Sequence, residues 1–244
     1  MRGTWYNLKK YGIFSGNELM QLFVTCGFIA LAFFLNWWRN HDLNALSGTF
    51  WFLAFFAAAL VFMFVHVFAQ KWKAANNGYK MYYGYWIPGL LFTLLINVLS
   101  RGAIILFVPG IVDAELIKGQ RIGVFRGIFK FKDMAIFSLF GPIASIIVVF
   151  ILKPIYFATG SVNTSFVGLL ILMTLLIALY SLIPYPYSVG LNMYRSMRFS
   201  VFWAAATILA FTLLIYFANM FAFILAFIIG LVVFIIYHVL VEKK

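Results

Sequence analysis

The chain has 244 residues, of which 65% are hydrophobic and only 10% are charged, whereas a typical soluble domain carries about 25% charged residues. No water-soluble fold can bury this much apolar surface, so the composition excludes a soluble globular protein and indicates an integral, multi-pass membrane protein. The net charge is +12, but the basic residues lie in short segments between apolar runs, which excludes a nucleic-acid-binding patch and fits topology signals at a membrane surface.

Six apolar runs are long enough to cross a bilayer as helices. They comprise residues 19–38, 49–69, 134–152, 166–183, 199–217 and 220–240. Only Ala218 and Asn219 separate the last two runs, which form either one bent helix or a tight hairpin. A hairpin is favoured, because a continuous helix of that length would far exceed the thickness of a bilayer. We therefore expect a single membrane domain over residues 1–244.

The segment 86–109, between the second and third runs, is apolar but contains several residues that interrupt a helix. If it crosses the membrane once, the basic residues divide almost evenly between the two sides. If it dips in and returns, 16 of the 18 basic residues lie on one side, and only Arg39 and Lys153 lie on the other. The positive-inside rule selects the second topology. We predict a re-entrant segment, a cytoplasmic basic loop over 110–133, and both termini in the cytoplasm.

Irregular backbone at membrane depth is tolerated only where protein or a water-filled cavity covers it, so a re-entrant segment marks a candidate site. The residues expected to shape it are Pro88, Gly89, Asn97, Pro109 and Gly110.

Ionisable residues are scarce within the predicted spans, where they would be costly unless they had a function. All six acidic residues fall in predicted loops or at span edges. His66 lies inside the second span, and Gln70 follows it four residues later on the same helix face. These two residues are the first candidates for a site.

The helix around His66 resembles the zinc-binding helix of the site-2 protease family of intramembrane metalloproteases. In the family motif HExxH, the two His residues bind zinc and the Glu is the general base. Here His66 keeps the first position, Val67 stands where the Glu would be, and Gln70 replaces the second His.

Three further segments match in the family's order. Residues 87–110 resemble its membrane-embedded, partly β loop, and residues 140–145 resemble its Gly-Pro motif. Residues 181–190 fit the pattern NxxPxxxLDG. In that last pattern Pro184 and Gly190 are kept, whereas Ser181 replaces Asn, Ser188 replaces Leu, and Val189 replaces the zinc-ligating Asp.

The resemblance implies an all-α polytopic membrane protein, with six transmembrane helices and a re-entrant, partly β, membrane-embedded segment between the second and third. It also implies that His66 and Gln70 face Val189 across the bundle, in a pocket filled by apolar side chains, and that His66 has one hydrogen-bond partner. Catalytic zinc needs three protein ligands, an open water site and a base. Only His66 remains of these groups, so we expect no catalytic residue, no metal and no cofactor.

The sequence therefore predicts a catalytically inactive relative of the family, which lies in the lipid bilayer and binds a hydrophobic helix or another membrane protein without cleaving it. One alternative is a structural subunit of a larger membrane complex. Another is an active intramembrane metalloprotease with unrecognised ligands. A channel or carrier is disfavoured, because few polar residues lie within the spans.

Overall fold

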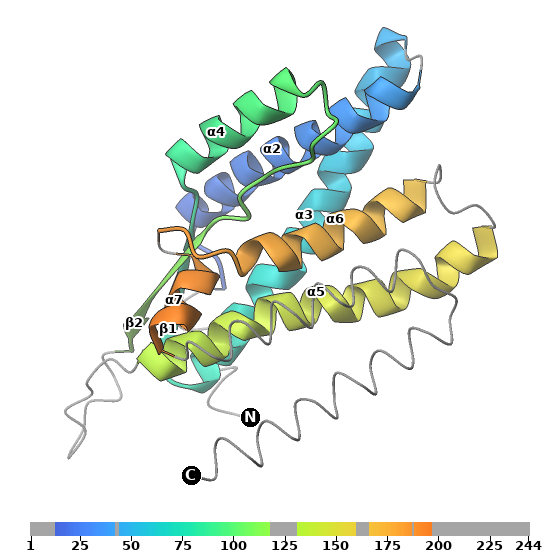
Figure 1. Ribbon diagram of the computed structural model, residues 1–244. Helices are drawn as coiled ribbons and strands as arrows, with labels where there is room; N and C mark the ends of the chain where they lie inside the picture. The colour runs from blue at the N-terminus through green and yellow to red at the C-terminus, as the bar shows by residue number, and fades with distance from the viewer. Residues whose placement is uncertain (1–12, 42–43, 118–130, 160–165, 187, 197–244) are drawn as a thin grey trace, which may run out of the picture.

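The computed structural model describes residues 13–41, 44–117, 131–159, 166–186 and 188–196. This part of the chain is mostly helical and contains one small sheet. Its elements are α2 (Gly16–Asn40), α3 (Ala45–Asn76), β1 (Tyr79–Gly84), α4 (Ile87–Leu99), β2 (Ile111–Leu116), α5 (Phe131–Thr159), α6 (Phe166–Ser181) and α7 (Val189–Ser196). Helix α3 packs against both α2 and α5, α5 packs against α6 and α7, and α4 lies along α2 (Figure 1).

Three described helices are long and apolar enough to cross a membrane: α2, α3, and α5 over Asp133–Lys153. They contain the predicted spans 19–38, 49–69 and 134–152. Helix α6 begins where the fourth span was predicted, but it ends at Ser181 after 16 residues, a length of about 24 Å. The predicted spans 199–217 and 220–240 lie outside the described residues. The structure thus supports a helical membrane protein with three candidate spans.

Local residue types mark where the helices begin and end. Ser15 and Glu18 form a capping box at the start of α2, in which each side chain accepts a hydrogen bond from the other residue's backbone N–H. Pro88 lies in the first turn of α4, where its missing N–H costs no helical hydrogen bond. Helix α3 gives way to β1 through Gly78, which has a φ of 81°, a conformation that favours glycine.

The two strands are antiparallel, with Tyr79 opposite Leu116 and Gly84 opposite Ile111. The chain between them, residues 85–110, therefore leaves the sheet and comes back to it. We call this segment the excursion. It runs outward as helix α4 and returns in extended conformation (Figure 1).

The excursion follows α2 for most of the length of that helix. At its base, the N–H of Tyr83 in β1 donates to the carboxylate of Glu18 over 2.9 Å. At its far end, the Asn36 side chain donates to the carbonyl of Gly102 over 2.8 Å. Glu18 and Asn36 are 18 residues apart on one helix, so the excursion extends about 27 Å. This is close to the roughly 30 Å hydrocarbon thickness of a bilayer.

The placement of the β structure corrects the sequence prediction. The strands flank the predicted segment 86–109 and do not lie inside it, and the predicted basic loop 110–133 begins with β2 and ends in the first turn of α5. The reason is the residue pattern: β1 alternates between buried and half-buried residues, as a strand does, whereas the residues after Pro88 are mostly apolar, with Thr93 and Asn97 four apart on one buried face, and form a helix. Residues 118–130 lie outside the described part.

The core lies where α2, α3, α5 and α6 meet. Its large buried side chains include Phe33, Phe55, Met63, Phe137 and Met173. The outer faces of these helices are apolar too: Phe50, Leu53 and Val61 of α3 are each more than half exposed. Helices that are apolar on both faces are typical of a membrane-embedded bundle.

Candidate functional site

The predicted residues His66 and Gln70 lie at a polar contact between α3 and α5, which we call the seam. It comprises His66 and Gln70 from α3 and Ser138, Gly141 and Ser145 from α5. The side chains of His66 and Gln70 are 3% and 0% exposed. They lie one helical turn apart, so both face α5.

Gly141, the glycine of the Gly-Pro motif, allows the two helices to approach at the seam. A Cβ atom at this position would lie 2.3 Å from Nε2 of Gln70 and 2.6 Å from Nε2 of His66. These distances are too short for any non-bonded contact, so only glycine fits without displacing both side chains. The motif that the sequence singled out therefore lies directly against His66 and Gln70.

Hydrogen bonds involve both ring nitrogens of His66. Nδ1 lies 2.9 Å from Oγ of Ser145, and Nε2 lies 3.2 Å from Nε2 of Gln70. The same Gln70 nitrogen donates to the carbonyl of Ser138 over 3.1 Å. A carbonyl only accepts, so this nitrogen is the amide NH₂, and its second hydrogen goes to Nε2 of His66. His66 therefore carries its proton on Nδ1 and donates it to Ser145. The sequence predicted one partner for His66, and it has two.

Two polar atoms of the seam have no hydrogen-bond partner within the described part of the chain. They are Oε1 of Gln70 and Oγ of Ser138, both fully buried. Ser138 thus contributes its backbone carbonyl to the seam, whereas Ser145 contributes its hydroxyl. This difference between two serines on one helix gives a matched pair for mutation.

The residues at the family's zinc-binding positions do not fit a zinc ion. Val67 and Val189 are 1% and 3% exposed, belong to the same apolar cluster, and offer no donor atom. Gln70 holds His66 and Ser138 with its amide hydrogens. Within the described ranges, no three His, Cys, Asp or Glu side chains gather closely enough to bind a metal.

The final motif, residues 181–190, connects α6 to α7. The Ser181 hydroxyl donates to the Ala178 carbonyl of its own helix, and Pro184 is exposed in the connection. Gly190 is required by close packing, since a Cβ there would lie 2.0 Å from the carbonyl oxygen of Leu182. Apart from their bond to each other, the hydrogen-bond partners of His66 and Gln70 come from α5, against which α7 also packs. That His66 and Gln70 face Val189 stays a prediction.

Ser188 has a role that the sequence reasoning missed, because it was treated only as a replaced Leu. Its hydroxyl accepts the N–H of Leu191 over 2.9 Å and the N–H of Tyr185 over 3.1 Å, and donates to the carbonyl of Ile183. Ser188 is thus the N-cap of α7. The signal was available, since serine is among the preferred residues immediately before a helix.

The final motif also holds the base of the excursion. The Tyr185 hydroxyl donates to the carbonyl of Gly110, and its ring stacks on Trp86 at 5.5 Å. The Tyr83 hydroxyl donates to the carbonyl of Pro109 over 2.9 Å. Burial raises the pKa of the Tyr83 and Tyr185 hydroxyls above the ordinary value for tyrosine, so both remain protonated donors.

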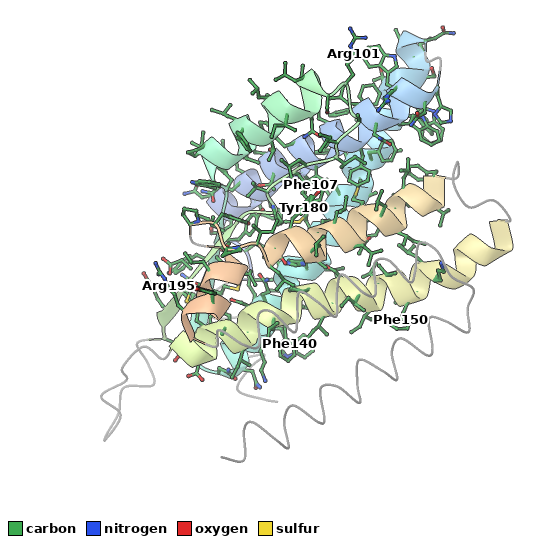
Figure 2. The ribbon with its side chains drawn as sticks, viewed as in Figure 1. Arg101, Phe107, Phe140, Phe150, Tyr180 and Arg195 are labelled. Carbon is green, nitrogen blue, oxygen red and sulfur yellow. The ribbon has the colours of Figure 1, made fainter. Side chains whose placement is uncertain are left out.

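Side chains from α4 and α6 hold the returning half of the excursion. Asn97 donates to the carbonyl of Leu106 and accepts the N–H of the same residue. The Tyr180 hydroxyl of α6 donates to the carbonyl of Ile105 over 2.7 Å, and its ring lies edge-on to Phe107 at 5.0 Å (Figure 2). These bonds supply partners for backbone groups that an extended chain leaves open.

Within the predicted segment, Gly89 packs against the ring of Trp86, and a Cβ there would lie 2.2 Å from that ring. Gly110 has a φ of 107°, which favours glycine. Asn97, Pro109 and Gly110 also take part in the hydrogen bonds that hold the excursion. That these residues shape a re-entrant segment stays a prediction.

A buried ion pair was also missed. Lys71 Nζ lies 2.6 Å from the carboxylate of Glu18, which also accepts the N–H groups of Ser15 and Tyr83. Lys71 lies 4.5 Å from the centre of the Phe14 ring. We call Ser15, Glu18, Lys71 and Tyr83 the ion-pair cluster. The capping-box pattern in the sequence places Glu18 at a helix start, but nothing in the sequence indicates its partner 53 residues later.

The structure thus joins His66 and Gln70 to the Gly-Pro motif, and joins the final motif to the base of the excursion. Comparison of the chain with protein-family models, with curated proteins and with solved structures finds no match.

Proposed function

We propose that this chain is a catalytically inactive, site-2-protease-like integral membrane protein that binds a hydrophobic helix or another membrane partner without cleaving it. The observation that carries the proposal is the seam. His66 and Gln70 lie against Gly141, so two of the segments on which the resemblance rests meet there, and both ring nitrogens of His66 are engaged with protein side chains.

The loss of chemistry follows from the residue types. Peptide hydrolysis by a metalloprotease needs a water molecule activated by a metal ion and a base. Val67 cannot act as a base, and neither Gln70 nor Val189 offers a carboxylate or imidazole ligand. A scaffold with these three changes keeps its packing surfaces and loses the means to activate water.

The outer face of α4 is the proposed binding surface. Its large apolar side chains are between 54% and 74% exposed: Ile87, Leu91, Phe92, Leu95, Val98 and Leu99. The inner face, with Leu90, Thr93 and Asn97, is buried. The exposed residues recur at helical spacing over about 18 Å, which matches the way an amphipathic or apolar helix is recognised through anchors on one face.

A photo-crosslinking amino acid at Leu95, introduced in native membranes, tests this binding. We expect a discrete adduct with a single-span membrane protein of unchanged length, and no protein adduct from a matched probe at Phe50 on α3, which is also exposed. A constant stoichiometric partner at Leu95 would favour the structural-subunit alternative. A shortened partner, whose cleavage depends on the chain, would overturn the proposal in favour of an active protease.

A re-entrant course for residues 86–109 is part of the proposal, and the pairing of β1 with β2 supports it because the two ends of the excursion meet. Figure 2 has Arg101 at the far end of α4, and the excursion extends about 27 Å from its base. Cysteines replacing Arg101 and Glu115 should therefore react with a membrane-impermeant reagent from opposite sides. This course moves Arg101 from the cytoplasmic group of basic residues, where the count from the sequence put it, to the side of Arg39 and Lys153. Reaction of both cysteines from one side would show that the excursion does not penetrate the bilayer. The native Cys26 is fully buried and gives little background.

A further inference from the structure

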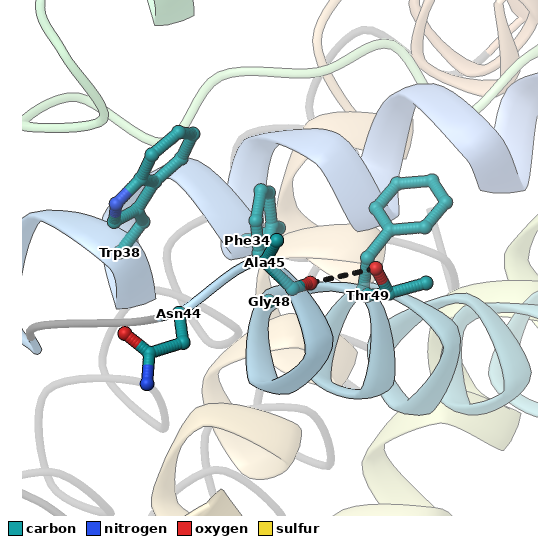
Figure 3. A pocket seen from close by; sticks show the side chains of 7 residues that line it. Phe34, Trp38, Asn44, Ala45, Gly48 and Thr49 are labelled. Carbon is teal, nitrogen blue, oxygen red and sulfur yellow. Dashed lines mark hydrogen bonds between the residues drawn. The ribbon is translucent and has the colours of Figure 1, made fainter.

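A cavity of about 460 Å³ lies between the end of α2 and the beginning of α3, within the range of roughly 300–1,000 Å³ typical of ligand sites. One wall is aromatic: Phe34 lies 5.6 Å from Trp38 and 5.9 Å from Phe52, measured between ring centres. Gly48, which has no side chain, lies next to Phe34 in the lining (Figure 3). None of these residues belongs to the seam or to the outer face of α4.

The cavity is polar at one end and apolar along its length. Asn44, the residue before α3, lines it and makes no capping bond with its side chain. Thr49 also lines it, but its hydroxyl donates back to the carbonyl of Ala45. Arg39 follows Trp38 in the last turn of α2 and is exposed. Asn44 is thus a polar lining residue where α3 begins, and the exposed Arg39 is next in sequence to the lining residue Trp38.

This end of the helix pair has the features of a membrane surface. Helices α2 and α3 are both candidate spans, so the connection between them lies where the chain leaves the apolar region. Tryptophan and arginine at the end of a span are typical of the headgroup level. The cavity therefore begins at headgroup depth and continues toward the hydrocarbon between two spanning helices.

The volume of the cavity limits what it can hold. A helix with side chains is about 10 Å wide, so 460 Å³ holds only about one turn of it. A single acyl chain is narrow enough to lie along the aromatic wall. We propose that the cavity binds one acyl chain of a phospholipid from the surrounding bilayer, with the phosphate near Arg39 and Asn44, where a cation and an amide can pair with it.

Photolabelling tests the proposal with full-length protein in phosphatidylcholine vesicles that contain phosphatidylcholine with a photoactivatable acyl chain. Labelled peptides are mapped by mass spectrometry. We expect labelling of the Phe34 and Phe52 region to exceed severalfold that of Phe92 on α4, which reports ordinary contact with bulk lipid. Equal labelling of the two regions would overturn the proposal.

Variants at Gly48 supply the matched control. A Cβ there would lie 3.7 Å from the Phe34 ring, an ordinary contact, so Gly48→Ala should leave the labelling unchanged. Gly48→Leu should fill the cavity and reduce labelling to the level at Phe92. Ala45→Leu, on the same wall, gives a second filled variant if Gly48→Leu does not fold. Undiminished labelling in a folded, filled variant would also overturn the proposal.

Discussion

Two buried polar clusters differ in charge and in position. The seam is neutral and lies within α3 and α5, whereas the ion-pair cluster joins the start of α2 to the end of α3 and to β1. Among the described residues, the seam leaves two atoms without a partner, Oε1 of Gln70 and Oγ of Ser138. In the ion-pair cluster, Glu18 accepts three hydrogen bonds, from Lys71, Ser15 and Tyr83.

The difference follows from the cost of burial. An unpartnered neutral group costs about 1–3 kcal/mol in a protein, whereas an unpaired buried charge costs far more. A neutral contact can therefore keep an imperfect hydrogen-bond pattern, whereas a buried charge is kept only where its partners are complete. On the proposed function, the seam would be the remnant of a site and the ion-pair cluster would be structural.

Breaking the ion pair should have the largest effect. In Lys71→Met, the carboxylate of Glu18 stays buried without its cation, and removal of one partner of a buried pair costs about 3–5 kcal/mol. We expect a loss of that size in the free energy of unfolding, measured by denaturation in mixed micelles.

The matched control is the double variant Lys71→Met with Glu18→Gln, in which the neutral amide can still accept from Tyr83. It should recover part of the loss. A double variant less stable than Lys71→Met alone would show that the charge of Glu18 is not the cause.

Adding a methyl group at Gly141, where α3 and α5 are in close contact, should have an intermediate effect on stability. In Gly141→Ala, the new methyl group displaces the side chains of His66 and Gln70, and overpacking of this kind costs about 1–3 kcal/mol. Gly27→Ala is the control, because its Cβ would meet only Phe56, at 4.0 Å. Equal stability of the two variants in the same denaturation assay would contradict the close contact at Gly141.

The smallest expected effect on stability is the difference between replacing Ser145 and replacing Ser138 in the seam. Ser145→Ala removes the acceptor for Nδ1 of His66 and should cost about 1 kcal/mol. Ser138→Ala removes a hydroxyl with no partner in the described structure and should change stability by less than about 0.5 kcal/mol. If Ser138→Ala proves the more damaging substitution, the hydrogen-bond pattern assigned to the seam is wrong.

Local patterns were sufficient to predict much of the architecture. Long apolar runs predict α2, α3 and α5 because burial in lipid requires about 20 apolar residues, whatever their partners. The spacing of His66 and Gln70 predicts a shared face because residues four apart are neighbours on a helix. Helix α4 was not predicted, because Pro88, Gly89 and Asn97 were expected to interrupt a helix, whereas Pro88 lies in its first turn.

Contacts between distant segments were not predictable in the same way. Glu18 and Lys71 were read separately as span-edge charges, since no rule of spacing links residues that far apart. The strands β1 and β2 were missed because six-residue strands next to an apolar segment give a weak signal. The fit of Gly141 against His66 depends on how two helices pack, and no pattern in the sequence indicates it.

The central claim is that a metalloprotease-like scaffold has lost its metal site through Val67, Gln70 and Val189. The most direct measurement is the zinc content, by elemental analysis, of the purified wild-type chain and of a folded triple variant, Val67→Glu with Gln70→His and Val189→Asp. We predict no stoichiometric zinc in the wild type and about one zinc per chain in the variant, because Nε2 of His66 already faces position 70. About one zinc per chain in the wild type would contradict the loss of the site, and a folded variant without zinc would contradict the scaffold.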